Sequence, residues 1–416
     1  MTARVAEPQI SQDHGPISIG RAAALGLLLL CIYLATGEYS NRYGADAFTN
    51  AAQARAFADD QDPILEELAG FEEYNGIYGW FAVAPGGTTA QYPPGTAIWA
   101  APFYLVDSSF ETTTFEREAQ DGTITEVEVA VPSTLAPATA AAALSVAIAI
   151  AFLFLTLAEN LPQRTALIAA TIAGTGTGAW SVASDKLWQH GPAMMCISIG
   201  TYFASKDRFA ASGVAFGFAL LVRPHTAAIA ACIGLTVAFA RRSVRPALEM
   251  GVTSALGLVA LLWYNNVVFG SPSISGGYGG VFAERLIEES PWVVIERLIG
   301  ALIHGRVGIL WSSPIVGLAM VALVLCVRKL PAWAIGGAIG GFVYMVIQLR
   351  ANRVTGGSGF FSYRYPLEAL MVAAPALVFS VWQWAKNSDS RQRLVIVLAA
   401  LSVLAHGFGA LMPTNL

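Results

Sequence analysis

The sequence predicts an all-α integral membrane protein, a polytopic helical bundle, on three observations. Hydrophobic residues make up 55% of the 416 residues and charged residues only 12%, whereas a soluble domain carries about 25% charged residues. The mean hydropathy is +0.56. Apolar runs long enough to cross a bilayer recur along the chain. This composition excludes a cytosolic enzyme, a disordered regulator and a disulfide-rich secreted domain, and the net charge of −4 offers no basic surface for nucleic acid.

Eleven apolar runs are predicted to cross the membrane as helices. A bilayer core about 30 Å thick needs about 20 apolar residues per helix, and fewer where the helix is broken or packed in protein. The predicted spans are residues 22–36, 135–158, 165–184, 192–205, 209–222, 226–240, 246–269, 313–327, 332–349, 366–385 and 394–412.

The charges of the connections orient these spans. One alternating set of connections is short and holds 13 basic and 6 acidic residues, whereas the other is long and holds 11 basic and 22 acidic residues. Cytoplasmic loops carry an excess of Lys and Arg, so the first set is predicted to be cytoplasmic. The expected order is a cytoplasmic tail (1–21), the first transmembrane helix (22–36), an outer loop (37–134), transmembrane helices (135–270), a second outer loop (271–312) and the C-terminal transmembrane helices (313–416).

Both outer loops contain apolar segments that are not predicted to span the membrane. Residues 93–106 are too short, and residues 292–310 carry interspersed charges, so we expect both to be interfacial helices. Between the first of these and the next span lies an acidic insert, residues 107–134, in which the alternating residues 123–131 suggest a small hairpin. Glu66, Glu67, Glu72 and Glu73 are expected on the solvated face of a helix.

The first outer loop carries the most informative pattern. Asp46 comes shortly after the first span and precedes an alanine-rich helical run, residues 50–58. The loop closes at Tyr92-Pro93-Pro94-Gly95, where the prolines suit the start of a helix.

This arrangement resembles the GT-C glycosyltransferases, integral-membrane enzymes that take sugars from polyprenyl-phosphate donors. The likeness is greatest to the branch related to protein mannosyltransferases, arabinosyltransferases and the lipid A aminoarabinose transferase. It rests on Asp46, the helix after it and Tyr92-Pro93-Pro94-Gly95, continued by Trp263-Tyr264-Asn265 and Ser362-Tyr363-Arg364-Tyr365-Pro366. The acidic insert departs from the family pattern, and no soluble C-terminal domain is expected. The resemblance implies a GT-C-like bundle of about eleven transmembrane helices with outer juxtamembrane helices.

The resemblance implies a catalytic role for Asp46. Inverting transfer needs a carboxylate that takes the proton of the acceptor hydroxyl as this hydroxyl attacks the anomeric carbon. The alternative is that Asp46 caps the following helix, since Asp is a strong N-cap residue.

Transfer also needs cations that stabilise the leaving phosphate. The candidates near outer span ends are Arg306, Arg353 and Arg364, followed by Lys186 and Arg223. Arginine suits this task because its planar fork matches phosphate oxygens. The alternative for each is an anchor in the headgroup layer. Arg223 in Arg223-Pro224-His225 is predicted to lie in an outer turn, either recessed into the membrane plane or exposed to solvent.

Further residues are candidates for the substrate pocket. The short outer loop 185–190 combines acidic, basic, aromatic and histidine side chains that suit a sugar. Asp185 there either partners Lys186 or ligates a divalent ion; no metal site is predicted firmly. The pocket candidates are Tyr92, Asp185, His190, Tyr264, Asn265, Tyr278 and Tyr363, with Tyr264, Asn265 and Tyr278 implied by the resemblance alone.

These observations predict an inverting glycosyltransferase in the cell membrane. It would move a monosaccharide from a polyprenyl-phosphate donor to a glycan or glycolipid acceptor of the cell envelope at the outer face. A transporter or flippase of a lipid-linked sugar is the main alternative. Such a protein would be expected to carry charged residues in the middle of its spans and an internal repeat that relates its two halves. A membrane scaffold or sensor is a second alternative, which the long outer loops permit.

Overall fold

The computed structural model describes residues 19–39, 45–59, 62–65, 81–106, 110–118, 124–132, 134–356 and 359–412. The first 18 residues of the predicted cytoplasmic tail lie outside the described residues, as do Glu66, Glu67, Glu72 and Glu73.

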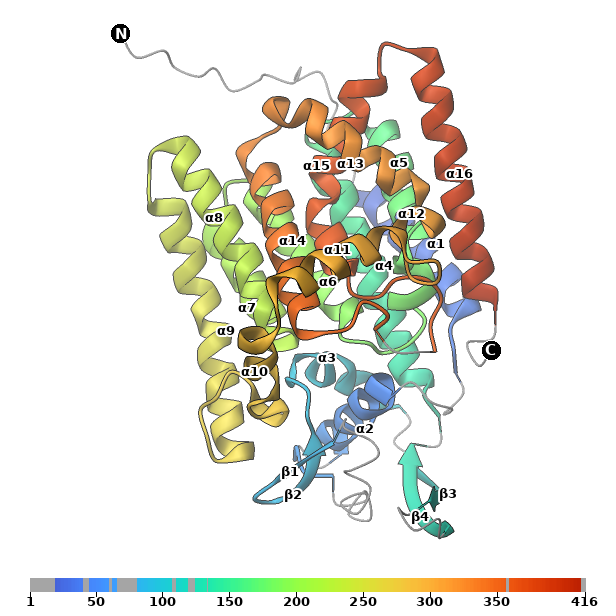
Figure 1. Ribbon diagram of the computed structural model, residues 1–416, viewed down its shortest axis with the longest axis vertical. Coiled ribbons are helices and arrows are strands. Elements are labelled where there is room, and N and C mark those ends of the chain that lie inside the picture. The colour runs from blue at the N-terminus through green and yellow to red at the C-terminus, as the bar shows by residue number, and fades with distance from the viewer. Residues whose placement is uncertain are drawn as a thin grey trace.

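Long helices form a bundle whose axes run roughly from one end of the molecule to the other (Figure 1). They are α1 (Ile19–Thr36), α4 (Ala136–Ala158), α5 (Gln163–Thr175), α6 (His190–Ser205), α7 (Phe209–Val222), α8 (Ala227–Arg241), α9 (Arg245–Phe269), α13 (Pro314–Cys326), α14 (Ala332–Ala351), α15 (Leu367–Ala385) and α16 (Asp389–Leu411). The predicted all-α polytopic membrane fold is confirmed. Seven helices of the described part of the chain are long and apolar enough to cross a membrane. Because α5, α6, α7 and α13 are shorter, the count of eleven spans stays a prediction.

Two predicted helices are divided in the structure. The span expected over residues 165–184 ends as α5 at Thr175 and resumes as a π-helical turn, η2 (Ala179–Ala183), because Gly176 leaves the helical conformation. The interfacial helix expected over residues 292–310 is α11 (Pro291–Ile303), which ends where His304 becomes extended, and the separate short α12 (Ile309–Ser312). In Figure 1, α11 runs obliquely across the bundle.

The two ends of the bundle differ in chemistry. At one end, basic residues of the connections bind polar residues at the ends of other helices. Arg21 donates to Gln163, and Arg241 pairs with Asp207 at 2.6 Å. The described elements of the predicted outer loop 37–134 stand together at the opposite end, at the bottom of Figure 1. These basic connections and the first predicted outer loop therefore lie at opposite ends of the bundle, while the side of the membrane that each faces stays a prediction.

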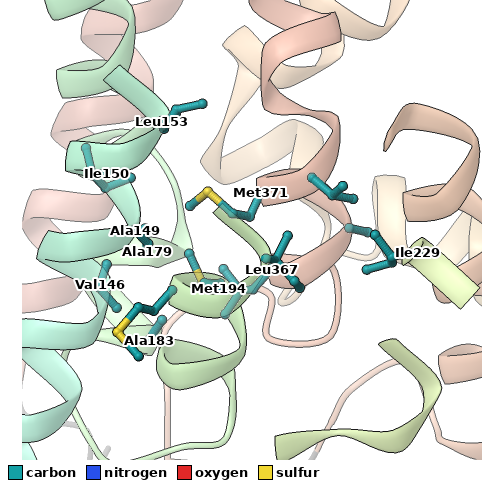
Figure 2. Close-up of a cluster of buried hydrophobic side chains, with 14 of the residues drawn as sticks. Val146, Ala149, Ile150, Leu153, Ala179, Ala183, Met194, Ile229, Leu367 and Met371 are labelled. Carbon is teal, nitrogen blue, oxygen red and sulfur yellow. The ribbon is translucent and has the colours of Figure 1, made fainter. Parts of the chain in front are cut away.

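The centre of the bundle is filled by small and branched apolar side chains. Figure 2 shows Val146, Ile150 and Leu153 of α4 facing Met194 of α6 and Met371 of α15, and all five are buried. Lipid tails are as apolar as these side chains, so close packing rather than the hydrophobic effect holds such helices together.

An outer cap covers the end of the bundle that holds the site. We use this name for α2 (Ala45–Asp59), α3 (Gly95–Tyr104) and the antiparallel strands β1 (Phe81–Ala84) and β2 (Gly87–Ala90). Buried alanines join α2 to α3, among them Ala51, Ala54 and Ala97. Beside the cap, β3 (Phe110–Glu118) pairs with β4 (Ile124–Pro132) as the hairpin predicted in the acidic insert. The second outer loop adds α10 (Val281–Glu288).

Helices α7 and α9 approach so closely that only glycine fits between them. A Cβ added at Gly257 of α9 would lie 2.0 Å from the carbonyl oxygen of Gly217 in α7. At Gly251, also in α9, no atom lies within 4 Å of an added Cβ. Small residues at helix crossings of this kind let membrane helices pack backbone against backbone.

We expect Gly257→Ala to lower the thermal unfolding temperature of the purified protein in detergent, because the two helices must separate. Overpacking of this kind costs about 1–3 kcal/mol. Gly251→Ala is the matched control and should be neutral or slightly stabilising, since alanine favours the helix over glycine. Equal melting temperatures for the two variants would contradict the backbone contact.

Candidate active site

The carboxylate of Asp46 lies where the outer cap meets the bundle. Asp46 is in the first turn of α2, and its side chain is 24% exposed. The phenol of Tyr92 donates to Oδ1 at 2.7 Å, and Nη1 of Arg364 lies 3.0 Å from Oδ2. The structure thus directs both carboxylate oxygens to side chains of other segments.

Three aromatic rings surround the guanidinium of Arg364. Its central carbon lies 4.6 Å from the ring centroid of Trp188, 5.2 Å from that of Tyr365 and 5.5 Å from that of Phe360. A guanidinium over aromatic faces is attracted by the negative face of each ring, more strongly where water is excluded. We call these three rings the aromatic cage.

A second charged group lies deeper, at the ends of four bundle helices. Arg223 ends α7 and donates through Nη1 to Glu368 Oε1 at 2.9 Å and through Nη2 to Gln348 Oε1 at 3.0 Å. His190, the first residue of α6, lies 2.8 Å from the same Glu368 oxygen. All four side chains are buried. We call them the inner cluster.

Tyrosine rings connect the two charged groups. Tyr365 lies under Arg364 and 6.5 Å from the ring of His190. Tyr278 meets the ring of Tyr92 edge-on at 5.8 Å. The Asp46–Arg364 pair and the inner cluster therefore form one continuous polar region, with two arginines and two carboxylates.

The local sequence explains how Tyr92 and Tyr278 reach this region. Gly95, the first residue of α3, lies against the backbone of Leu221 and Val222, and an added Cβ would be 2.7 Å from those atoms. A Cβ on Gly277 would lie 2.5 Å from the Cα of Gln91. Glycine at each position lets one chain segment lie directly on another, which brings the neighbouring tyrosines together.

The loop before α15 fixes Arg364 through its neighbours. Ser362 has a positive φ of 67°, and its hydroxyl bonds to Ser312. The hydroxyl of Tyr363 lies 2.8 Å from Ser313 Oγ, inside the bundle. With its neighbours anchored on that side, Arg364 extends toward Asp46.

Burial and the Asp46 carboxylate set the protonation of the groups around them. Burial, and then the nearby carboxylate of Asp46, raises the pKa of Tyr92 well above 10. The pKa of Tyr278 is raised for the same two reasons. Burial alone would lower the pKa of Arg364, but Asp46 outweighs it and the net shift is upward. At neutral pH the tyrosines are therefore proton donors and Arg364 is a cation.

Several predicted residues have other surroundings. Tyr264 accepts from Gln53 Nε2 at 2.7 Å and so joins α9 to α2, and Asn265 donates to the backbone of Ser273 at 2.6 Å. Arg306 and Arg353 are exposed in turns, after α11 and after α14. Tyr363 belongs to the buried hydroxyl network described above.

Asp185 and Lys186 lie buried in the loop between η2 and α6, three and two residues before Trp188 of the cage. The backbone carbonyl of Asp185 accepts from Glu38 N–H at 3.1 Å, which joins this loop to the end of α1. Burial raises the pKa of Asp185 to about 7; Lys186 opposes this shift and Glu38 adds to it. Among the described residues no three His, Cys, Asp or Glu side chains lie together as a metal site.

The site includes residues that were not among the sequence candidates. Glu368, Gln348, Phe360 and Tyr365 fall within or directly before α14 and α15. Glu368 had one available signal: a carboxylate in the first turn of a span, two residues after Pro366. Arg223 was a candidate, and its burial excludes the solvent-exposed turn.

An apolar cavity of about 530 Å³ lies among the helices of the bundle. Its lining includes Leu367, next to Glu368 in the chain, and Met194, one turn after His190. From there it follows α15 to Lys386 at the basic end of the bundle. A helix of this length spans roughly 28 Å at 1.5 Å per residue, close to the thickness of a bilayer core.

Comparison with known structures identifies the architecture. The crystal structure of an oligosaccharyltransferase from Archaeoglobus fulgidus in the apo form matches 95% of this chain with a TM-score of 0.53 and 14% identity. The chain has the GT-C fold. It spans 56% of the length of that oligosaccharyltransferase. No family model and no curated protein sequence matches the chain.

A second overlap involves the archaeal oligosaccharyltransferase AglB from Archaeoglobus fulgidus in complex with an inhibitory peptide and a dolichol-phosphate. It covers 94% of this chain and 55% of that one, with a TM-score of 0.46 and 11% identity, which is too weak to support a functional comparison. The GT-C fold expected from the order of the sequence motifs is confirmed by the first comparison. In this GT-C fold, Asp46 and Arg364 meet at the border between the bundle and its outer elements.

The raised pKa of Asp185 predicts a specific pH dependence of stability. Between about pH 4 and pH 7 the folded protein holds the proton of Asp185 while the unfolded chain has released it. The free energy of unfolding therefore falls as pH rises through this window, by up to about 1.4 kcal/mol per pH unit.

We expect Asp185→Asn to flatten the decline of the melting temperature between pH 5 and pH 7. Glu296→Gln, which changes an exposed carboxylate, should keep the wild-type decline; an unchanged slope in Asp185→Asn would refute the assignment.

Proposed function

We propose that this multi-pass membrane protein is an inverting glycosyltransferase. It moves a monosaccharide from a polyprenyl-phosphate donor to a lipid or polysaccharide of the cell envelope, on the extracytoplasmic face of the cell membrane. The carrying observation is the carboxylate of Asp46 held against Arg364, three residues before Leu367, which lines an apolar cavity that follows α15. Base, cation and apolar groove are the three parts that this transfer needs.

Asp46 is the proposed general base. The acceptor oxygen attacks the anomeric carbon, and its proton passes to the Asp46 carboxylate. The bond between the anomeric carbon and the phosphate oxygen breaks with its electron pair on that oxygen, which releases polyprenyl phosphate. Partial exposure of Asp46 supports the role, because an acceptor hydroxyl must reach it. The hydrogen bond from Tyr92 orients the carboxylate.

Arg364 is the best supported of the proposed phosphate contacts. Its Nε is buried and has no hydrogen-bond partner among the described residues, and the same is true of Nε1 of Trp188 in the cage. Buried donors are normally satisfied, so two unused ones mark a place for acceptor oxygens. The buried Nε of Arg223 also lacks a partner among the described residues, but both terminal nitrogens of that guanidinium are bound, by Glu368 and Gln348. Lys186 lies beside Asp185. Arg306 and Arg353 remain proposals on their position at the outer end.

The apolar cavity is the proposed site of the polyprenyl tail. Its walls are formed by α4, α5, α6, α13, α15 and α16, and nearly all of the lining side chains are apolar. A tail in this cavity places its phosphate end near Leu367, three residues after Arg364.

Replacing Asp46 tests the proposed base. Asp46→Asn is expected to lower the transfer rate by about 10²- to 10⁴-fold, the usual contribution of a general base. Release of polyprenyl phosphate from a panel of lipid-linked sugars measures this rate. Asp59→Asn is the matched control, since Asp59 lies in the same helix and also pairs with an arginine, Arg55, at 2.9 Å. Full transfer activity in Asp46→Asn would remove the enzyme proposal in this form.

Filling the cavity tests the proposed tail site. Ala374→Phe adds bulk to the wall contributed by α15, and should raise KM at least several-fold for a donor with a long polyprenyl chain. Ala374 lies seven residues after Leu367, roughly 10 Å along α15 at 1.5 Å per residue. A donor with a single isoprene unit is therefore the internal control, and its KM should stay unchanged. Equal effects on the two donors would place the tail elsewhere.

A further inference from the structure

We propose that donor phosphate and Asp46 compete for Arg364, so that donor binding releases the base from its ion pair. The proposal rests on the proposed function and adds a regulation to the same site. Without donor, Arg364 holds the carboxylate; with donor, its guanidinium turns to the phosphate and Asp46 is left to act on the acceptor.

The contacts of Asp46 describe a carboxylate that is engaged. Oδ1 accepts from Tyr92 at 2.7 Å, and Oδ2 lies 3.0 Å from Arg364. A general base ends its step protonated. Both oxygens that could receive this proton are already engaged, one by a hydroxyl and the other by a guanidinium.

The aromatic cage lets Arg364 leave Asp46 at low cost. Attraction to the faces of Trp188, Tyr365 and Phe360 depends on the position of the guanidinium more than on the direction of its N–H groups. The guanidinium keeps this attraction when it turns. Its buried Nε, without a partner among the described side chains, offers a further donor to a second oxygen.

The inner cluster does not offer a comparable exchange. Glu368 is fully buried and holds both Arg223 and His190, whereas Asp46 is 24% exposed and lies in the outer cap. Separating Arg223 from Glu368 would leave a buried charge unpaired, which is strongly destabilising. An incoming anion therefore competes with Asp46.

The movement of charge in the reaction fits this exchange. During transfer the proton of the acceptor neutralises Asp46, and the cleaved bond leaves its electron pair on the phosphate. Negative charge thus passes from the carboxylate to the phosphate. An arginine placed between them is paired with a negative partner before the donor binds and after the sugar leaves.

Binding of polyprenyl phosphate, measured on the full chain in lipid nanodiscs without an acceptor, tests the exchange. Asp46→Asn and Asp46→Ala should each bind it more tightly than wild type, by roughly three- to tenfold, because the competing charge is gone. Arg364→Gln should bind it at least tenfold more weakly. In the Arg364→Gln background, Asp46→Asn should produce no gain. Asp59→Asn should bind as wild type does.

Opposite outcomes separate the two proposals. If Asp46 only positions Arg364, removing its charge weakens or does not change binding, and either result overturns the exchange. In that case loss of transfer in Asp46→Asn still supports the proposed function. The uncharged polyprenol is the control ligand: wild type that binds it as tightly as polyprenyl phosphate has no phosphate site, and both proposals fail.

Discussion

Charge balance in a region with little water is the constraint on which this structure depends. Two arginines and two carboxylates lie within one polar region, and each charge has a partner of opposite sign. Burying an ion costs several kcal/mol unless partners compensate for it. The elements that carry these four residues must therefore keep their relative positions. The ion pairs hold the outer cap on the bundle and hold α7 against α14 and α15.

The two ion pairs differ in how firmly they are held. Glu368 receives Arg223 and His190 in a fully buried position, and Gln348 takes the second nitrogen of the guanidinium. Asp46 comes from a helix outside the bundle and retains contact with solvent. Buried ion pairs contribute little net stability but penalise any other arrangement. The Arg223–Glu368 pair therefore holds the helix ends in one arrangement, whereas the Arg364–Asp46 pair can exchange partners at lower cost.

The fold and the candidate site differ in how far the sequence predicts them. Apolar runs, loop charges and the alternating insert predict the helices, their two ends and the hairpin, because each signal is local. Asp46 and Arg364 were both candidates, but nothing in the sequence indicates that they pair. That contact depends on how α2 lies over the loop before α15. Glu368 and Gln348 were missed because a polar residue near a span end has the same local pattern whether it faces lipid, water or an arginine.

The break in the helix predicted over residues 165–184 has a consequence for the site. Because α5 stops at Thr175 and the chain then forms the π-helical turn Ala179–Ala183, the segment that follows enters the interior instead of continuing outward. This detour carries Trp188 beneath Arg364 and starts α6 at His190. Irregular backbone inside a membrane protein is tolerated only where protein or a water-filled space surrounds it. The interrupted helix is therefore possible only because the surrounding helices bury it, and its interruption in turn supplies the side chains that line this buried region.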